Sequence, residues 1–185
     1  MTNYSQEQLK SLLGSVGEHV QIHSSVVFFN PKKIFISSHV RIDCFSLLSA
    51  GEDGIHISNH IHIGAGSYLF GGGGKIELDP FVNISSRVSL FTSNDDYIDG
   101  YMTNPMVPHH YKKVENGPIS LKKHAIIGSG SIILPNVEIG VGAAVGALSL
   151  VKKSVEPCAI VCGIPAKKKA VRNQKFLELE LEFNP

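Results

Sequence analysis

Two adjacent aspartates, Asp95 and Asp96, open a segment that is rich in side chains able to accept or donate protons. Residues 94–120 contain these carboxylates together with two histidines and three tyrosines, and few large aliphatic residues. A loop of this length in a compact domain is often functional. A carboxylate or an imidazole placed there can remove a proton from a nucleophile, which is the task of a general base. This segment is therefore our first candidate for a catalytic centre.

The composition limits the kind of protein that can carry such a centre. The chain has 185 residues, a formal net charge of +1, 18% charged and 43% hydrophobic residues, which is typical of one globular domain. A nearly neutral charge argues against a general nucleic-acid binder. The uncharged stretch 139–151 is too short and too glycine-rich to span a bilayer, and no secretory signal is visible. Three cysteines, an odd number, suggest free thiols and a cytoplasmic location.

A six-residue period predicts the elements that position the candidate groups. Eighteen six-residue units each begin with an apolar residue: Val16, Ile22, Phe28, Ile36, Ile42, Leu48, Ile57, Ile63, Leu69, Ile76, Val82, Val88, Leu121, Ile127, Ile133, Ile139, Val145 and Val151. The units group in threes, as blocks 16–33, 36–53, 57–74, 76–93, 121–138 and 139–156. An α-helix has a period of 3.6 and a flat sheet a period of 2, so neither fits. Three short strands per turn instead predict an all-β parallel β-helix of about six coils.

The two ends of the chain do not follow this period. Residues 5–13 begin with a helix-capping serine and carry leucines at helical spacing, so a short helix is expected there. After Pro165 we expect a C-terminal tail that is helical at first. The predicted segments are therefore a helical cap at 1–15, the β-helix at 16–156 with the loop 94–120 inserted, and a tail at 157–185.

Histidines form a column across the predicted coils. His19, His39, His60 and His124 occupy the same place in their blocks, and Asp79 has that place in the fourth block. Stacked coils bring these positions into one row, with neighbours about 4.8 Å apart. The row is either a ladder on an exterior corner or, at His60, part of an acceptor pocket. We expect His62, two residues further on, to act as an auxiliary acid or base.

Three stretches of sequence carry a resemblance to a known family. They are IIGSGSIILPNVEIGVGAAVGALSLV at 126–151, CGIPAKKK at 162–169, and GGGGKIELDPFVNISSRVSLFTSNDDY at 71–97. With these, the chain resembles the hexapeptide-repeat acyltransferases. The third stretch is most similar to sugar acetyltransferases, which include galactoside O-acetyltransferases and enzymes that N-acylate nucleotide-linked amino sugars for surface polysaccharides. The resemblance implies a left-handed β-helix, homotrimers with sites between subunits, and acetyl-CoA or another acyl-CoA as donor.

The resemblance also implies which residues act on the acceptor. Galactoside-type relatives have a general-base histidine where this chain has Asn94, so attention moves to Asp95 and Asp96. A hydroxyl holds its proton tightly and favours a histidine base, whereas a carboxylate suffices for a partly unprotonated amine. Similar sugar N-acyltransferases point to a serine in the preceding coil, here Ser86 or Ser85. The remaining acceptor-binding candidates are His60, Asn94, Tyr97, His109 and His110, with His109 or His110, reaching a neighbouring subunit, as the alternative base.

For the CoA donor, the resemblance points to the C-terminal coils. Backbone groups there bind the pantetheine amides, and lysines bind the phosphates. The candidates are Gly128, Ser129, Gly146, Ala147, Lys152, Lys153, Lys167 and Lys168.

Three other functions remain as alternatives. A galactoside-type O-acetyltransferase would use a histidine base and a hydroxyl acceptor. A γ-type carbonic anhydrase holds zinc with three histidines, but His56, His60 and His62 crowd one coil rather than adjacent coils. A non-catalytic scaffold does not explain the acidic loop. We expect no metal, because the spacing of the cysteines does not suit zinc.

Overall fold

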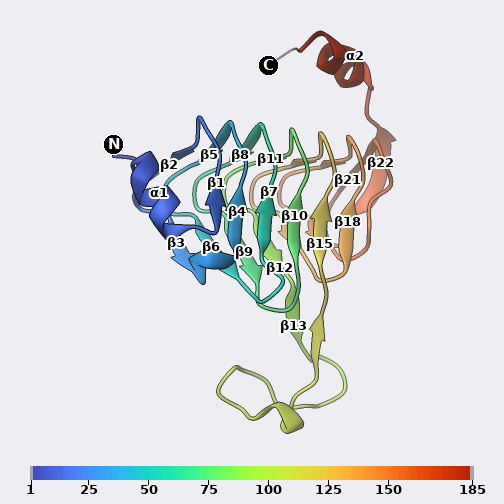
Figure 1. Ribbon diagram of the computed structural model, residues 1–185. Coiled ribbons are helices and arrows are strands. Elements are labelled where there is room, and N and C mark those ends of the chain that lie inside the picture. Colours follow the sequence, from blue (N-terminus) through green and yellow to red (C-terminus); the bar gives the residue numbers. More distant parts are fainter. Residues whose placement is uncertain (1, 184–185) are drawn as a thin grey trace.

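The computed structural model is a stack of short parallel strands wound into a three-sided solenoid (Figure 1). It describes residues 2–183, so residues 1 and 184–185 of the predicted terminal segments lie outside it. The first face contains β1 (Ser15–Val16), β4 (Ile34–Ile36), β7 (Ile55–Ile57), β10 (Ile76–Leu78), β15 (Ile119–Leu121) and β18 (Val137–Ile139). The second contains β2 (Gln21–Ile22), β5 (Val40–Ile42), β8 (Ile61–Ile63), β11 (Asn83–Ile84), β16 (Ile126–Ile127), β19 (Ala144–Val145) and β21 (Ala159–Cys162).

The third face completes each turn. It contains β3 (Val27–Phe29), β6 (Leu47–Ala50), β9 (Tyr68–Gly71), β12 (Ser89–Phe91), β17 (Ile132–Ile133) and β20 (Leu150–Val151). The predicted parallel β-helix is confirmed, and its six coils are present. Strand β21 adds one side of a further turn, using residues that the sequence assigned to the tail.

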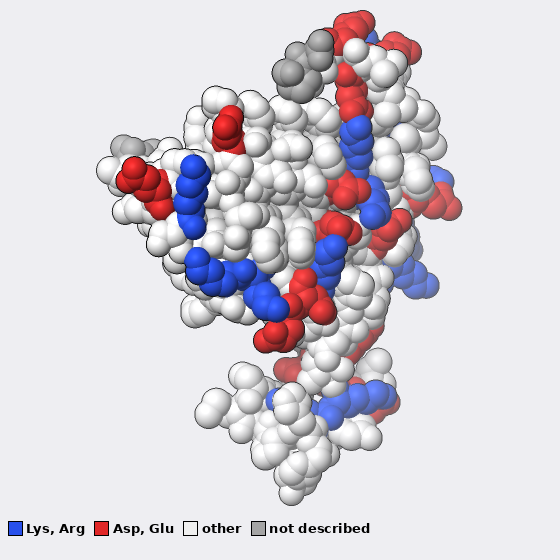
Figure 2. Space-filling view, in the orientation of Figure 1, with Lys and Arg blue, Asp and Glu red and all other residues white. Residues whose placement is uncertain are grey.

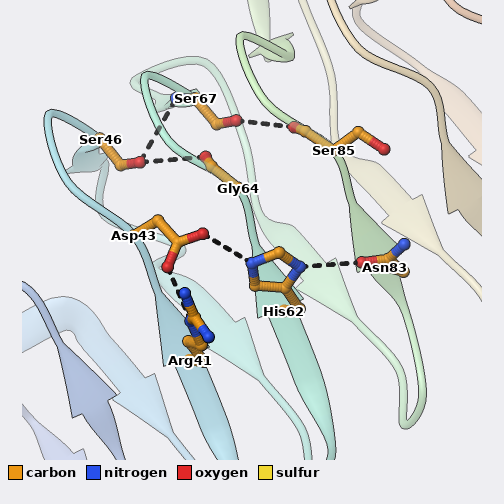
Figure 3. A network of polar contacts seen from close by, with 8 residues as sticks. All are labelled: Arg41, Asp43, Ser46, His62, Gly64, Ser67, Asn83 and Ser85. Carbon is orange, nitrogen blue, oxygen red and sulfur yellow. Dashed lines mark hydrogen bonds and ion pairs between the residues drawn. The ribbon is translucent and has the colours of Figure 1, made fainter.

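Side chains that point inward form a continuous apolar core. Large aliphatic residues such as Ile57, Ile63 and Leu69 are at most 1% exposed. Buried serines fill some of the smaller inward places, and their hydroxyls bind backbone oxygens of the next coil. Ser67 Oγ, for example, donates to the Ser85 carbonyl at 3.0 Å (Figure 3). Each coil is therefore tied to its neighbour by core packing and by hydrogen bonds.

The predicted phase of the fourth block was wrong by two residues. Leu78, rather than Ile76, pairs with Ile57 and Leu121, so the units of this coil begin at Leu78, Ile84 and Leu90. Residues 76, 82 and 88 and residues 78, 84 and 90 are all apolar and buried. The pattern of apolar residues alone therefore could not show which set begins the six-residue units. As a consequence, Phe81 rather than Asp79 aligns with the histidines, and Ser86 does not occupy an inward position.

The two ends are only partly as expected. Helix α1 (Gln6–Leu12) is confirmed, and Ser5 and Gln8 form its capping box. The tail does not begin as a helix: β22 (Lys167–Val171) pairs antiparallel with β21, and α2 (Lys175–Glu182) follows. Strand β21 would otherwise expose an open sheet edge, which β22 covers. Within residues 2–183, no helix is long and apolar enough to cross a bilayer.

The long loop is a two-stranded arm. Strands β13 (Ser93–Asp95) and β14 (Val114–Asn116) pair antiparallel, and a short 3-10 helix, η2 (His109–Tyr111), lies between them in the chain. Figure 1 shows this arm, residues 93–116, projecting away from the coils below β12. The arm begins where the third face of the fourth coil ends, so its base lies next to that face.

Candidate active site

A groove of about 1000 Å³, the arm groove, lies between the base of the arm and the third face of the last three coils. Asn94, Asp95, Asp96 and Tyr97 line it from the arm. Phe91, Ile132, Leu134 and Leu150 form its floor, and Lys152 lines it as well. The structure thus brings together five of the predicted site residues. Sequence reasoning missed the four apolar floor residues, although each flanks an inward residue on a strand and so had to face outward.

The two aspartates have different surroundings. Asp96 accepts hydrogen bonds from the backbone N–H groups of Asp99, Ile98 and Tyr101 at 3.0–3.2 Å. These bonds, led by that from Asp99, hold the pKa of the Asp96 carboxyl below its ordinary value. The half-buried Asp95 has no hydrogen-bond or ion-pair partner for its carboxylate among the described residues. Asp96 therefore shapes the turn of the arm, while Asp95 is available to a ligand.

The two candidate serines lie at a different place, the turn between the second and third faces. Ser86 is exposed, and its carbonyl accepts a hydrogen bond from the Gly130 N–H at 3.0 Å. Ser85 is half-buried and accepts the bond from Ser67 described above. Neither serine lines the arm groove of its own chain.

His62 lies on the outer side of the second face in a polar network (Figure 3). Its Nε2 is 2.8 Å from Asp43 Oδ2, and its Nδ1 is 3.2 Å from Asn83 Oδ1. Arg41 Nε donates to the other Asp43 oxygen at 2.7 Å. Burial raises the pKa of Asp43, but the bonds from His62 and Arg41 outweigh it and leave this pKa below its ordinary value. The imidazole is well oriented, yet it does not line the arm groove of the same chain.

The histidine column is a ladder of stacked rings on one corner of the solenoid. His19, His39, His60, Phe81 and His124 follow one another with ring centroids 4.7–5.0 Å apart. Helix α2 and its C-cap residue Phe183 cover the last three rings of this ladder. Phe183 packs edge-on against His60 and Phe81, and Glu180 Oε2 lies 2.8 Å from His124 Nε2. Burial, together with the nearby His39, lowers the pKa of His60.

This placement separates three predicted acceptor-binding residues from the arm groove. His60 belongs to the contact between the coils and α2. His109 and His110 lie in the 3-10 helix of the arm, are exposed, and do not line the groove.

The four candidate lysines come together in a second groove of about 540 Å³, the lysine groove, between the last coil and β22. Lys152 lines both grooves, so they adjoin. Lys168 Nζ is 2.5 Å from Glu156 Oε2, a bond that lowers the pKa of Glu156 and neutralises this lysine. Lys152, Lys153 and Lys167 have no ion-pair partner among the described residues. These three are therefore available to a phosphate.

The remaining CoA candidates lie outside the lysine groove. Gly128, Ser129, Gly146 and Ala147 occupy the corner between the second and third faces, where Ser129 and Ala147 are exposed. A Cβ on Gly128 would lie 2.4 Å from the Ala147 nitrogen. Close stacking of the coils therefore explains this glycine without a ligand. Among residues 2–183, no three histidine, cysteine or acidic side chains gather as a metal site would require.

Two known proteins match this chain along nearly its full length. No family model matches the chain. The dTDP-4-amino-4,6-dideoxy-D-glucose acyltransferase of Escherichia coli is 45% identical over 96% of this chain and 93% of its own length. A variant of AntD, an N-acyltransferase from Bacillus cereus, was solved with dTDP-4-amino-4,6-dideoxyglucose and coenzyme A. It has a TM-score of 0.92 at 43% identity, with 97% of this chain and 95% of AntD covered. A galactoside acetyltransferase in complex with coenzyme A has a TM-score of 0.57 at 19% identity, over 92% and 70% of the two chains, and shares the fold.

Proposed function

The chain belongs to the family of hexapeptide-repeat sugar acyltransferases, and on that premise we propose that it N-acylates a dTDP-linked 4-amino sugar with acyl-CoA. The observation that carries this proposal is the Asp95 carboxylate in the arm groove, next to the groove that holds Lys152, Lys153 and Lys167. Within residues 2–183 none of these four side chains has an ion-pair partner. The product is a precursor of a surface polysaccharide, made in the cytoplasm. The three free cysteines support this location.

The proposed reaction is a direct attack on the thioester. The neutral amine nitrogen bonds to the carbonyl carbon, and the electron pair of the C=O bond moves onto oxygen. When this intermediate collapses, the C–S bond breaks and the amide forms. Asp95 accepts the proton that the nitrogen loses and passes it to the departing CoA sulfur. Where galactoside-type relatives have a histidine base, this chain has Asn94. The base that the arm offers is therefore the carboxylate of Asp95, which suits an amine acceptor better than a hydroxyl acceptor.

The choice of residues is supported by the AntD variants. Their substitutions are at a serine and at an aspartate ten positions further along the chain. Here Ser85 precedes Asp95, and Ser86 precedes Asp96, by the same interval. Because the Asp96 carboxylate is engaged by three backbone N–H groups, we favour the pair Ser85 and Asp95.

Release of free CoA thiol tests the proposal. We expect thiol release from acetyl-CoA in the presence of dTDP-4-amino-4,6-dideoxyglucose, and little with the same sugar nucleotide bearing a hydroxyl at that carbon. Equal rates with both acceptors, or a faster reaction of the hydroxyl sugar, would favour the O-acetyltransferase alternative instead.

We further propose that the enzyme is a homotrimer with sites between subunits. The outer side of the third face carries exposed apolar residues in its first and third coils, Phe29 and Tyr68. The arm also exposes Ile98 and Met106, and much of it is uncharged in Figure 2. Such surfaces are typical of contacts between copies. We predict a mass of about 60 kDa in light scattering, three times 20.0 kDa; a monodisperse monomer at micromolar concentration would contradict this.

For the donor, we predict that Lys167→Glu weakens CoA binding. Loss of one charged hydrogen bond to a phosphate corresponds to about a tenfold higher Kd. Calorimetry with CoA measures it, and the KM of the sugar nucleotide should change much less. Lys169→Glu is the matched control, because Lys169 is exposed on the same strand but does not line the lysine groove. Equal effects of the two reversals would indicate a long-range charge effect and no specific site at Lys167.

A further inference from the structure

Strand β22 forms one wall of the lysine groove, yet few contacts hold it there. Among the described strands it pairs only with β21, and the register of that pairing is broken once (Figure 1). All five of its residues are exposed, and so is its ion pair between Lys168 and Glu156. An exposed ion pair contributes little, and a segment with few buried apolar contacts opens easily. The position of Lys167 therefore depends on what fixes the ends of β22.

The two ends of β22 are fixed by different contacts. Before the strand, the Ala166 N–H donates to the Leu150 carbonyl at 2.8 Å. After the strand, Arg172 is half-buried, and its Nη1 donates to the carbonyls of His124 and Gly142 at 2.9 and 3.1 Å. These two carbonyls belong to adjacent coils, so one guanidinium joins the end of β22 to both coils.

Helix α2 packs over this guanidinium. The Phe176 ring lies 4.8 Å from Arg172 Cζ and 4.9 Å from the ring of His124. A Cβ on Gly142 would be 2.3 Å from the tip of the Phe176 ring, so this ring fills the space that the glycine leaves. One turn further along, Glu180 forms an ion pair with His124 if the imidazole is protonated. Arg172, Phe176 and Glu180 together form what we call the tail clasp.

We propose that Arg172 is a positioning residue for the donor, which holds β22 through the tail clasp and so keeps Lys167 in place for the CoA phosphates. This inference rests on the proposed function. The guanidinium is engaged by two carbonyls and an aromatic ring, so it acts through the strand. If the lysine groove exists only while β22 is docked, the apparent affinity for CoA falls with the docked fraction. Loss of hydrogen bonds from a charged donor shifts such an equilibrium by about tenfold or more.

The experiment compares Arg172→Gln and Phe176→Ala with the control Lys175→Gln. We expect the first two to raise the Kd for CoA in calorimetry about tenfold and to speed hydrogen exchange of the β22 amides. The kcat at saturating acetyl-CoA and the KM of the sugar nucleotide should stay within about twofold. Phe176→Ala removes no charge. Lys175→Gln removes one from the same tail, where Lys175 is exposed and only its backbone N–H has a hydrogen bond among the described residues.

The outcomes separate this inference from the function beneath it. Faster exchange in β22 with an unchanged Kd for CoA overturns the inference, and so does unchanged exchange in Arg172→Gln. An equal effect of Lys175→Gln would indicate a long-range charge effect, and a joint fall of kcat and of both affinities a general loss of structure; either result overturns it. Wild-type protein that binds CoA but releases no thiol contradicts the proposed function and leaves the role of Arg172 standing. Wild-type protein that binds no CoA contradicts both.

Discussion

Replacing Asp95 by asparagine is expected to lower kcat by about 10²–10⁴-fold, the range that loss of a general base usually costs. Asparagine keeps the shape of the side chain and one hydrogen-bond acceptor but cannot take the proton from the amine. The Asp95 carboxylate has no partner among the described residues, and the substitution keeps the backbone pairing with Val114, so the arm should not be disturbed. CoA affinity and the mass of the assembly should therefore stay at their wild-type values.

Asp96→Asn and His62→Asn are the comparisons for this result. Asp96→Asn should reduce kcat less, because the asparagine oxygen can still accept part of the hydrogen bonds that form the turn. A near-normal kcat for Asp95→Asn, with activity abolished by His62→Asn, would contradict the carboxylate mechanism. A histidine base, contributed by the Asp43–His62 network, would then replace it.

The second large effect is on stability: Gly64→Ala should lower the melting temperature by about 2–12 °C. A Cβ on Gly64 would lie 2.6 Å from the Ser86 nitrogen and 2.8 Å from the Ser85 carbonyl carbon, so two coils must separate. Overpacking of this kind costs about 1–3 kcal/mol, and each kcal/mol shifts the melting temperature of a domain this size by about 2–4 °C.

Gly72→Ala provides the matched control for that prediction. No atom lies within 4 Å of a Cβ placed on Gly72, so its melting temperature should change little. Thermal unfolding followed by circular dichroism measures both variants. Equal melting temperatures would show that the coils near Ser85 tolerate a side chain at this turn, and would contradict the close stacking described above.

The repeat could be read from the sequence because each coil has a large aliphatic residue in the same inward places. The phase of the fourth coil could not, since the pairs Ile76/Leu78 and Val82/Ile84 are both apolar and both buried. The arm could be recognised as an insertion. Its two strands could not, because the polar stretch Ser93–Asp95 has no alternation of apolar residues to mark it.

The candidate site was predictable to the extent that it depends on residue type. Galactoside-type relatives have a histidine where this chain has Asn94, and this difference pointed to the adjacent Asp95 and Asp96 as candidates for the base. Their different roles depend on backbone N–H groups that converge on Asp96 and that no pattern of side chains reveals. Likewise, Lys168 is paired with Glu156 only because β22 folds back along β21, a tertiary contact that local sequence does not specify.

The most direct test of the proposed chemistry is the identity of the bond in the product. The enzyme would be incubated with acetyl-CoA and dTDP-4-amino-4,6-dideoxyglucose, and the product examined by mass spectrometry before and after treatment with hydroxylamine. We predict a sugar nucleotide that gains one acetyl group, no longer has a reactive primary amine, and keeps the acetyl group in hydroxylamine, as an amide does. A product that retains its amine and loses the acetyl group to hydroxylamine would be an ester, and would contradict N-acylation.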